Sequence, residues 1–520
     1  MSCENQPGFT ATKEGNLQRR ITMRHRLNPQ PSLGTVSIKD VEFDCTSRHE
    51  LVPILMGLQH IYVNCTDVLE MMLKEIETDL CTSPNPGKGC PGMSLWENLV
   101  LAAVRHGCNL DYDQLADLAS YHTKLREILC ISSWDKDKRY KRSTVHGNIS
   151  RLSSETVRNI DQFIVDCGHA LCSGDPLKRV RFDSFVLKKN IHYPTDTNLV
   201  VDGVRKVVEI ARTLSDQLGI SGWRQHDYLK KKAKRILRTI TSIAKSRAKD
   251  REMRMRASYI ELLEHASFVV SKAGQTIRET KTHHKDVVEA IPLYRVELSD
   301  LQYFLAGTEY VCDLARRRML ENETIPNTDK VFSHFEPDTE LINRGKRPNP
   351  IEFGHRVLIG QDNAGFILHS EVMNIGITDE KIAVGAVKNL QARFAGKIKS
   401  VTFDKGFWTP DNLEELSEHV PLLVLPKKGK RKAEDELRER AKEFVQTRKW
   451  HAGVESAIHG LMVGNGMDVC RDKGAKGYRR YAAMATLGRN LQTLGNILVE
   501  KERKQYQKKK LTAPFAVLVG

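Results

Sequence analysis

The sequence predicts an α/β protein in which a sheet core is joined to helical domains. Two segments rich in β-branched and aromatic residues, 180–187 and 399–404, are typical of buried strands. Each places an aspartate directly after a phenylalanine, Asp183 in the first segment and Asp404 at the end of the second. A long helical stretch follows the first strand, and from residue 331 strands and helices alternate. Such alternation favours a layered α/β architecture.

Length and charge limit the class of protein. A chain of 520 residues exceeds what one core usually supports, so two or three structural domains are expected. The formal net charge of +16 indicates a polyanionic partner, of which nucleic acid is the commonest, although a merely soluble basic surface is the alternative. The eleven cysteines show no disulfide framework, and no apolar run reaches the roughly 20 residues of a membrane span. We therefore expect a soluble cytoplasmic protein with no membrane partner.

The N-terminal part is expected to be helical. Residues 1–90 would form a loose arm and a helix over 51–80, followed by a Pro/Gly linker over 84–92. Ser94 and Glu97 form a capping box that opens a helix through Val104. Helices are also predicted over 111–129 and 143–172, the latter broken near Ser153. Residues 91–175 would then be a helical domain suited to DNA binding or dimerisation.

Cysteines in this part raise the possibility of zinc. Cys81 with Cys90 is one candidate pair, and Cys167, His169 and Cys172 form another group. Neither has the C-x₂-C spacing of structural zinc sites, which weighs against this interpretation.

A helical insertion over 206–330 would separate the first core segment, 176–205, from the rest of the core, 331–500. Residues 226–256 hold twelve Lys or Arg against three acids, a local net charge of +9. An excess of one sign favours a phosphate-facing surface over a merely solvated face. Lys230, Lys231, Lys234 and Arg238 are the candidate DNA contacts.

The second core segment is predicted element by element. Strands over 353–360 and 366–372 would form a hairpin around a turn at 361–365. The pattern then predicts a helix over 378–394, the Asp404 strand, and a strand over 420–425. A charged segment over 427–449 precedes a helix that contains Glu455. A last helix over 475–505 leads into a basic tail, 501–520.

These segments together resemble a bacterial insertion-sequence DDE transposase. The resemblance rests on the Asp183 strand, the glycine-bearing hairpin Glu352-Phe-Gly-His-Arg-Val, the motif Phe-Asp404-Lys-Gly-Phe, and the helix with Glu455. The unit 92–130 is similar to that family's N-terminal helical domain, and Arg489-Asn-Leu-Gln-Thr-Leu-Gly495 resembles its C-terminal helix. The similarity covers about residues 90–500.

The resemblance implies an RNase H-like catalytic core with the two Asp strands adjacent and the last acid on a helix. Asp183, Asp404 and Glu455 would be the catalytic and metal-binding acids, with two Mg²⁺ ions as cofactors and Mn²⁺ able to substitute. Double-stranded DNA, both transposon ends and target, would be the partner of a homodimer or higher oligomer in the bacterial nucleoid. Relatives carry Tyr, Arg and Lys around the glutamate. Here Arg448 occupies the Tyr position, His451 the Arg position, and Met462 stands seven residues after Glu455.

The chemistry of the residues agrees with this expectation. Two carboxylates about 4 Å apart repel by roughly 4 kcal/mol, so such a pair shares a proton or binds a divalent metal. Mg²⁺ prefers oxygen ligands, and two ions can activate the nucleophile and stabilise the leaving oxygen of a phosphodiester. Lys405 is a further candidate phosphate contact, with a solvated lysine as the alternative.

Several alternatives stay open for individual residues. Asp196, Asp202 and Asp362 compete for a ligand role, although Asp362 is expected in the hairpin turn for backbone reasons. Glu455 is preferred over the glutamates of 434–443, which are expected on an exposed face with weak ion pairs. A zinc-type site of His451, Glu455 and His459 and a plain surface glutamate are its rivals. Phe407 and Trp408 would either pack under the strand or stack on an unpaired base.

Two other functions fit the same sequence. One is a non-catalytic or domesticated DNA-binding protein of the same fold, and the other is a nuclease that cuts without joining. An ATP-driven helicase is disfavoured because no G-x-x-x-x-G-K-[ST] stretch occurs.

Overall fold

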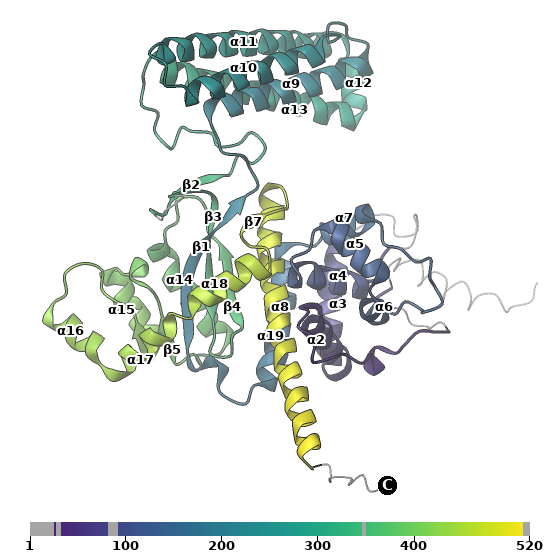
Figure 1. Ribbon diagram of the computed structural model, residues 1–520, viewed down its shortest axis with the longest axis vertical. Helices are drawn as coiled ribbons and strands as arrows, with labels where there is room; N and C mark the ends of the chain where they lie inside the picture. Colours follow the sequence, from purple (N-terminus) through teal and green to yellow (C-terminus); the bar gives the residue numbers. More distant parts are fainter. Residues whose placement is uncertain (1–24, 28–32, 82–91, 346–349, 513–520) are drawn as a thin grey trace, which may run out of the picture. The chain divides into compact units, whose positions relative to one another are not determined.

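The computed structural model describes residues 25–27, 33–81, 92–345 and 350–512. The chain is a mixed α/β protein, as predicted, and it forms two compact units. Unit 1 combines Met1–Lys188 with His355–Gly520, and unit 2 is Lys189–Gly354. Figure 1 shows the sheet and its helices in unit 1, and a helical bundle in unit 2. Among the described residues, no helix has the length and apolar character needed to cross a bilayer.

The N-terminal helices of unit 1 largely match the prediction. Ser94 and Glu97 form the capping box at the start of α4, with the serine side chain and the glutamate side chain each accepting a backbone N–H. Ser153 caps α8, so the predicted break at this residue is confirmed. The predicted linker over 84–92 lies almost wholly outside the described residues. The helices are α2 (Leu51–Asn64), α3 (Thr66–Leu80), α4 (Leu95–Gly107), α5 (Tyr112–Tyr121), α6 (Thr123–Ile128), α7 (Arg142–Ile149) and α8 (Ser154–Leu171).

The sheet is built from strands that are far apart in the sequence. The strands are β1 (Val180–Lys189), β2 (Glu340–Asn343), β3 (Ile351–Gln361), β4 (Ile367–Val372), β5 (Ser400–Thr402), β6 (Leu422–Val424) and β7 (Val469–Cys470). In unit 1 the order is β4-β3-β1-β5-β6, with β7 beside β1. β3 and β4 form the predicted antiparallel hairpin, and β1, β5 and β6 are parallel. In unit 2, β2 pairs with the first residues of β3.

The two faces of this sheet pack into different core clusters. Phe182 and Phe403 pack in one core cluster with α14. Phe185, Leu187 and Ile359 pack in another with α18 and α19. The helices of this part are α14 (Asp379–Arg393), α15 (Pro410–His419), α16 (Ala433–Arg440), α17 (Lys442–His451), α18 (Val454–His459) and α19 (Gly474–Thr512). A π-helical turn, η4 (Gly460–Gly464), follows α18.

Helix α19 joins the sheet to the N-terminal helices, and Figure 1 shows it running between them. Its contacts with α4 and α2 are close. A Cβ at Gly488 would lie 2.7 Å from the Gly107 amide nitrogen, and one at Gly495 would lie 1.8 Å from the Pro53 carbonyl oxygen. On the sheet side, the Asn490 amide accepts from Ile367 N at 2.7 Å and donates to Ile367 O at 2.8 Å. α19 is therefore a shared element of both halves of unit 1.

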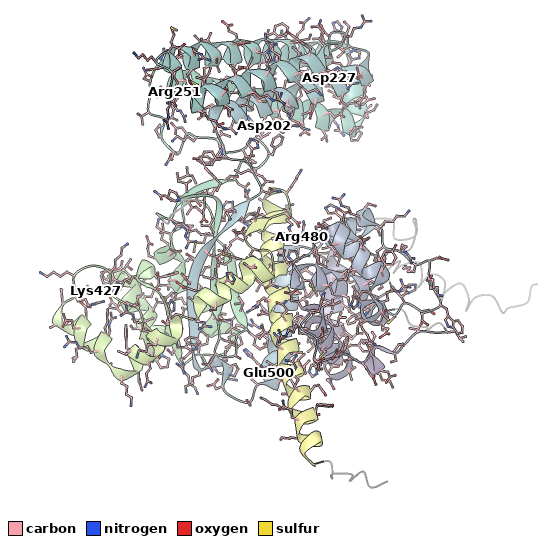
Figure 2. The ribbon with its side chains drawn as sticks, in the orientation of Figure 1. Asp202, Asp227, Arg251, Lys427, Arg480 and Glu500 are labelled. Carbon is pink, nitrogen blue, oxygen red and sulfur yellow. The ribbon has the colours of Figure 1, made fainter. Side chains whose placement is uncertain are left out.

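Unit 2 contains the predicted helical insertion. Its helices are α9 (Asp196–Leu218), α10 (His226–Lys245), α11 (Arg251–His283), α12 (Lys285–Ala290) and α13 (Pro292–Leu320). α9, α10, α11 and α13 share one apolar core. Figure 2 labels Asp227 in the first turn of α10 and Arg251 at the start of α11.

Candidate functional site

The two predicted aspartates occupy matching positions on neighbouring parallel strands. Val180 pairs with Val401 and Arg181 with Thr402, so the same register, continued by two residues, brings Asp183 beside Asp404. The intervening phenylalanines confirm that this register continues, since the rings of Phe182 and Phe403 stack with centroids 5.0 Å apart. Adjacent strands lie about 4.8 Å apart. The backbone therefore holds the two acids next to each other.

The two carboxylates lie in different surroundings, and Asp404 is not at the end of a buried strand as predicted. β5 ends at Thr402, so Asp404 lies just beyond the strand, and its side chain is exposed. Its Oδ1 accepts the Gly406 N–H and thereby caps the short 3₁₀ helix η3 (Lys405–Phe407). Asp183 lies inside β1, is half-buried, and accepts the Ser184 N–H at 2.8 Å. Asp404 thus has a hydrogen-bond partner in its own segment.

The helix that carries Glu455 packs on the sheet face that displays Asp183. Side chains alternate along a strand, so Asp183 is on the same face as Phe185. Phe185 shares a core cluster with Val454 and Leu461, so the apolar side of this helix packs against the sheet. Glu455, one residue after Val454, is exposed.

His451 connects Asp404 and Glu455 electrostatically. Burial lowers the pKa of His451, Asp404 and Glu455 oppose this shift, and Arg181 and Arg448 reinforce it. Both carboxylates therefore lie within electrostatic reach of the imidazole. Since the lowered pKa leaves the ring neutral at pH 7, His451 is a hydrogen-bonding group there rather than a cation. Its Nδ1 is buried without a hydrogen-bond partner among the described residues.

Arg181 fixes the junction of α17 and α18 to β1, and the sequence interpretation missed it. Its Nε donates to Gln361 Oε1 at 2.9 Å, and its Nη1 donates to the Trp450 carbonyl oxygen at 2.9 Å. The guanidinium also stacks over the Trp450 ring, 4.6 Å from its centroid. A Cβ at Gly453 would lie 2.2 Å from Nη1, so any larger residue there would displace the Arg181 guanidinium. No motif in the sequence marks this residue beyond its place two positions before Asp183.

Asp379 is a second residue that the sequence interpretation missed. It opens α14, and its Oδ2 lies 3.8 Å from where a Cβ on Gly406 would be, beside the Asp404 loop. Arg356 Nη1 is 4.0 Å from the same oxygen, whereas Oδ1 is buried with no hydrogen-bond partner among the described residues. An aspartate in the first turn of a helix is ordinary for backbone reasons, so the sequence held no special signal for it.

No three His, Cys, Asp or Glu side chains converge closely enough to hold a metal ion in the described part of the chain. This covers the predicted triad of Asp183, Asp404 and Glu455 as well as the zinc alternatives at His451, Glu455 and His459 and at Cys167, His169 and Cys172. His169 instead contacts Asp362 at 2.7 Å. Cys90 of the other candidate pair lies outside the described residues. The Mg²⁺ site stays a prediction that rests on the paired aspartates.

The competing aspartates have structural partners. Asp362 lies in the β3–β4 turn and accepts the N–H groups of Ala364 and Phe366, as expected of a turn residue. Asp196 pairs with Arg318 at 3.1 Å, and Asp202 pairs with His192 at 3.1 Å. Both of these belong to unit 2.

Lys405 and Arg448, the predicted lysine and arginine near the acids, are both exposed. Lys405 is exposed in η3. Arg448 is 45% exposed and lies 3.8 Å from Glu439. Glu439 corrects the expectation of a uniformly exposed acidic face, because its side chain is 7% exposed and also binds Arg431 at 3.0 Å. Phe407 is buried and packs in the core, whereas Trp408 is half-buried against it, so packing under the strand is confirmed.

The basic face of α10 is exposed as expected. Lys231, Lys234 and Arg238 are exposed, whereas Lys230 is half-buried and pairs with Asp227 at 3.1 Å. Apolar residues on the opposite face of α10, among them Ile236 and Ile240, pack into the bundle core. α10 is therefore amphipathic, with a cationic outer surface.

Comparisons with known proteins identify no relative. No family model, no curated protein and no solved structure matches this chain. Its function must therefore be inferred from the site itself.

Proposed function

We propose that the chain is a DDE-type DNA transposase, which binds the ends of its element and catalyses metal-dependent cleavage and strand transfer. The observation that carries the proposal is the register that brings Asp183 beside Asp404 on parallel strands. The packing of the Glu455 helix on the same sheet face adds support. An RNase H-like core is the finer interpretation, because that fold has adjacent Asp strands and a last acid on a helix.

The residues fit a divalent-ion site in their donor chemistry. Two adjacent carboxylates offer the oxygen ligands that Mg²⁺ prefers, and a cation relieves their mutual repulsion. When bound, a pair of such ions supplies activation of the attacking oxygen and stabilisation of the leaving oxygen. In this proposal Asp183 and Asp404 hold the ions, and Glu455 is the third acid. Lys405 and Arg448 would contact DNA phosphates, with neutral His451 as a hydrogen-bonding group beside them.

The test is a cleavage assay with labelled duplex DNA that carries the element's ends and flanking sequence. We expect cutting and joining with Mg²⁺ or Mn²⁺ and none in EDTA. Asp183→Asn and Asp404→Asn should each lower the cleavage rate at least about 100-fold, since these acids would be direct ligands, while DNA binding is retained. Undiminished cutting in EDTA would refute the assignment.

The same assay separates the alternatives. Cleavage without joined products would indicate a nuclease. Binding to DNA ends that needs no metal, with no cleavage in any buffer, would indicate a non-catalytic DNA-binding protein.

A further inference from the structure

A polar cavity of about 390 Å³ lies in unit 1, away from the paired aspartates. It is lined by α8, β4, α14 and α19. β4 is separated from β5, the strand that leads to Asp404, by β3 and β1. The volume is within the range of about 300–1,000 Å³ that small-molecule sites occupy.

Three arginines from three helices line this cavity: Arg158 of α8, Arg393 of α14 and Arg479 of α19. Arg393 is already engaged, since it donates to Gln162 O at 3.0 Å and pairs with Asp166 at 3.2 Å. Among the described residues, Arg479 donates only to the neutral Asn374 side chain, at 2.7 Å. Arg158 has no hydrogen bond or ion pair with any described residue. Two guanidinium groups at the cavity therefore lack a carboxylate at ion-pair distance.

The acids of the cavity do not cancel this charge. Glu371 lies 3.4 Å from His369, and that histidine is the main cause of its lowered pKa, with smaller effects from Arg158 and Arg479. Burial raises the pKa of Asp161 to about 7, against the opposing hydrogen bonds from Asn490. Near neutral pH the lining thus holds three cations against one full negative charge and one partial charge.

We propose that this cavity binds a phosphate group, with Arg158 and Arg479 as its two charged anchors. Guanidinium groups are planar forks that match phosphate oxygens in bidentate fashion, and two of them can neutralise a dianion. The remaining lining supplies neutral donors, among them Asn389 and Gln162. A monocarboxylate would leave one arginine uncompensated, which is why phosphate is the better match. The phosphate belongs either to a free nucleotide or to the end of a nucleic-acid strand.

The experiment is isothermal titration of the full chain in EDTA, so that the paired aspartates hold no metal. The titrants are inorganic phosphate, AMP, and a single-stranded oligonucleotide with or without a 5′-phosphate. The double variant Arg158→Gln/Arg479→Gln should weaken phosphate binding at least about tenfold, through the loss of two charge-assisted contacts. Asp161→Asn should strengthen it, because a residual negative charge is removed. Lys388→Gln is the matched control on α14, since Lys388 is exposed and pairs with Glu415 outside the cavity.

The outcomes decide both the site and the source of the phosphate. Binding of phosphate and AMP that is lost in the double variant supports a free ligand. Arginine-dependent binding of the 5′-phosphorylated strand alone supports a nucleic-acid end. Absence of binding by all four titrants, or binding that the double variant leaves unchanged, overturns the proposal. The titration does not measure cleavage, so its result neither depends on the proposed transposase function nor tests it.

Discussion

At the scale of single residues, the identity of the third acid is the sharpest question about the site. Glu455 is the acid that the transposase resemblance implies, but Asp379 lies beside the Asp404 loop, and one of its buried carboxylate oxygens has no hydrogen-bond partner among the described residues. An unpaired buried carboxylate oxygen is costly, and a bound cation would relieve that cost. Both residues are therefore candidates to complete the pair.

Single amide substitutions distinguish these acids. In the cleavage assay, Glu455→Gln should lower the rate at least about 100-fold if Glu455 is a direct ligand, and Asp379→Asn should have an effect below about tenfold. Glu443→Gln is the control, because Glu443 is exposed at the start of α17 and should act like the wild type. A larger loss of cleavage rate in Asp379→Asn than in Glu455→Gln would instead make Asp379 the third acid. Loss of activity in Glu443→Gln alone would show that the wrong helix was chosen.

The contact between Arg181 and Gly453 leads to a prediction about stability that needs no substrate. Gly453→Ala places a methyl group where the Arg181 guanidinium lies, so it should lower the free energy of unfolding by about 1–3 kcal/mol. Gly385→Ala is the matched control inside α14, where the new methyl group meets nothing within 4 Å. That change should raise stability by about 0.5–1 kcal/mol. Urea unfolding of the wild type and the two variants measures both changes in the free energy of unfolding. Equal changes in the two variants would contradict the close packing at Gly453.

At the scale of elements, α10 offers the clearest test of DNA contact. Neutralising Lys231, Lys234 and Arg238 to Gln should weaken binding for all sequences alike. The salt dependence, the slope of log K against log [salt], should become shallower by up to about 2.7, since each lost phosphate contact contributes about 0.9. Lys230 is left in place because its ion pair with Asp227 already reduces its availability.

The control for α10 is Lys281→Gln/Lys285→Gln, which removes exposed charges near the ends of α11 and α12. Filter binding at a series of salt concentrations gives the slope for each protein. An unchanged slope in the triple variant would mean that the cationic face of α10 is only solvated.

Particular elements show which parts of the fold can be predicted from local sequence patterns and which cannot. Helices and strands with a clear period, such as α8 with its break at Ser153 or the β3–β4 hairpin, were predicted because their signals are local. The register of β1 against β5 joins residues 221 positions apart, so no local pattern contains it. Glu439 was placed on an exposed face because its neighbours in the sequence are charged. Its burial arises from Arg431 and Lys427, which lie across a loop.

At the scale of the whole molecule, unit 1 is interrupted in the sequence but continuous in its core. Tyr478 Oη donates to the Leu187 carbonyl oxygen and accepts the His355 N–H at 3.2 Å. The two points where the chain leaves and re-enters unit 1 are therefore held by one side chain. Because these two points are close together, a short linker can join them at a small cost in loop-closure entropy.

Replacement of residues 190–353 by a short Gly/Ser linker should thus leave unit 1 folded. We expect a cooperative melting transition and retained secondary structure by circular dichroism, with a Tm within roughly 5 °C of the transition of unit 1 in the full chain. The same deletion protein with the substitution Tyr478→Phe, which removes the bridging hydroxyl, should have a lower Tm than the deletion protein with Tyr478. An unfolded deletion protein with Tyr478 present would show that unit 1 depends on unit 2.

The close packing of α19 has a consequence for how the protein is made. Gly488 and Gly495 press against the backbone of α4 and α2, and Asn490 hydrogen-bonds the backbone of β4. During translation α2 and α4 leave the ribosome about 400 residues before these partners, so the faces that α19 covers have no native partner for most of synthesis. At about 5–20 residues per second, that interval lasts on the order of 20–80 s. The bundle of unit 2, whose helices contact one another locally, can fold within this interval. Unit 1 can close only after residue 495 has emerged.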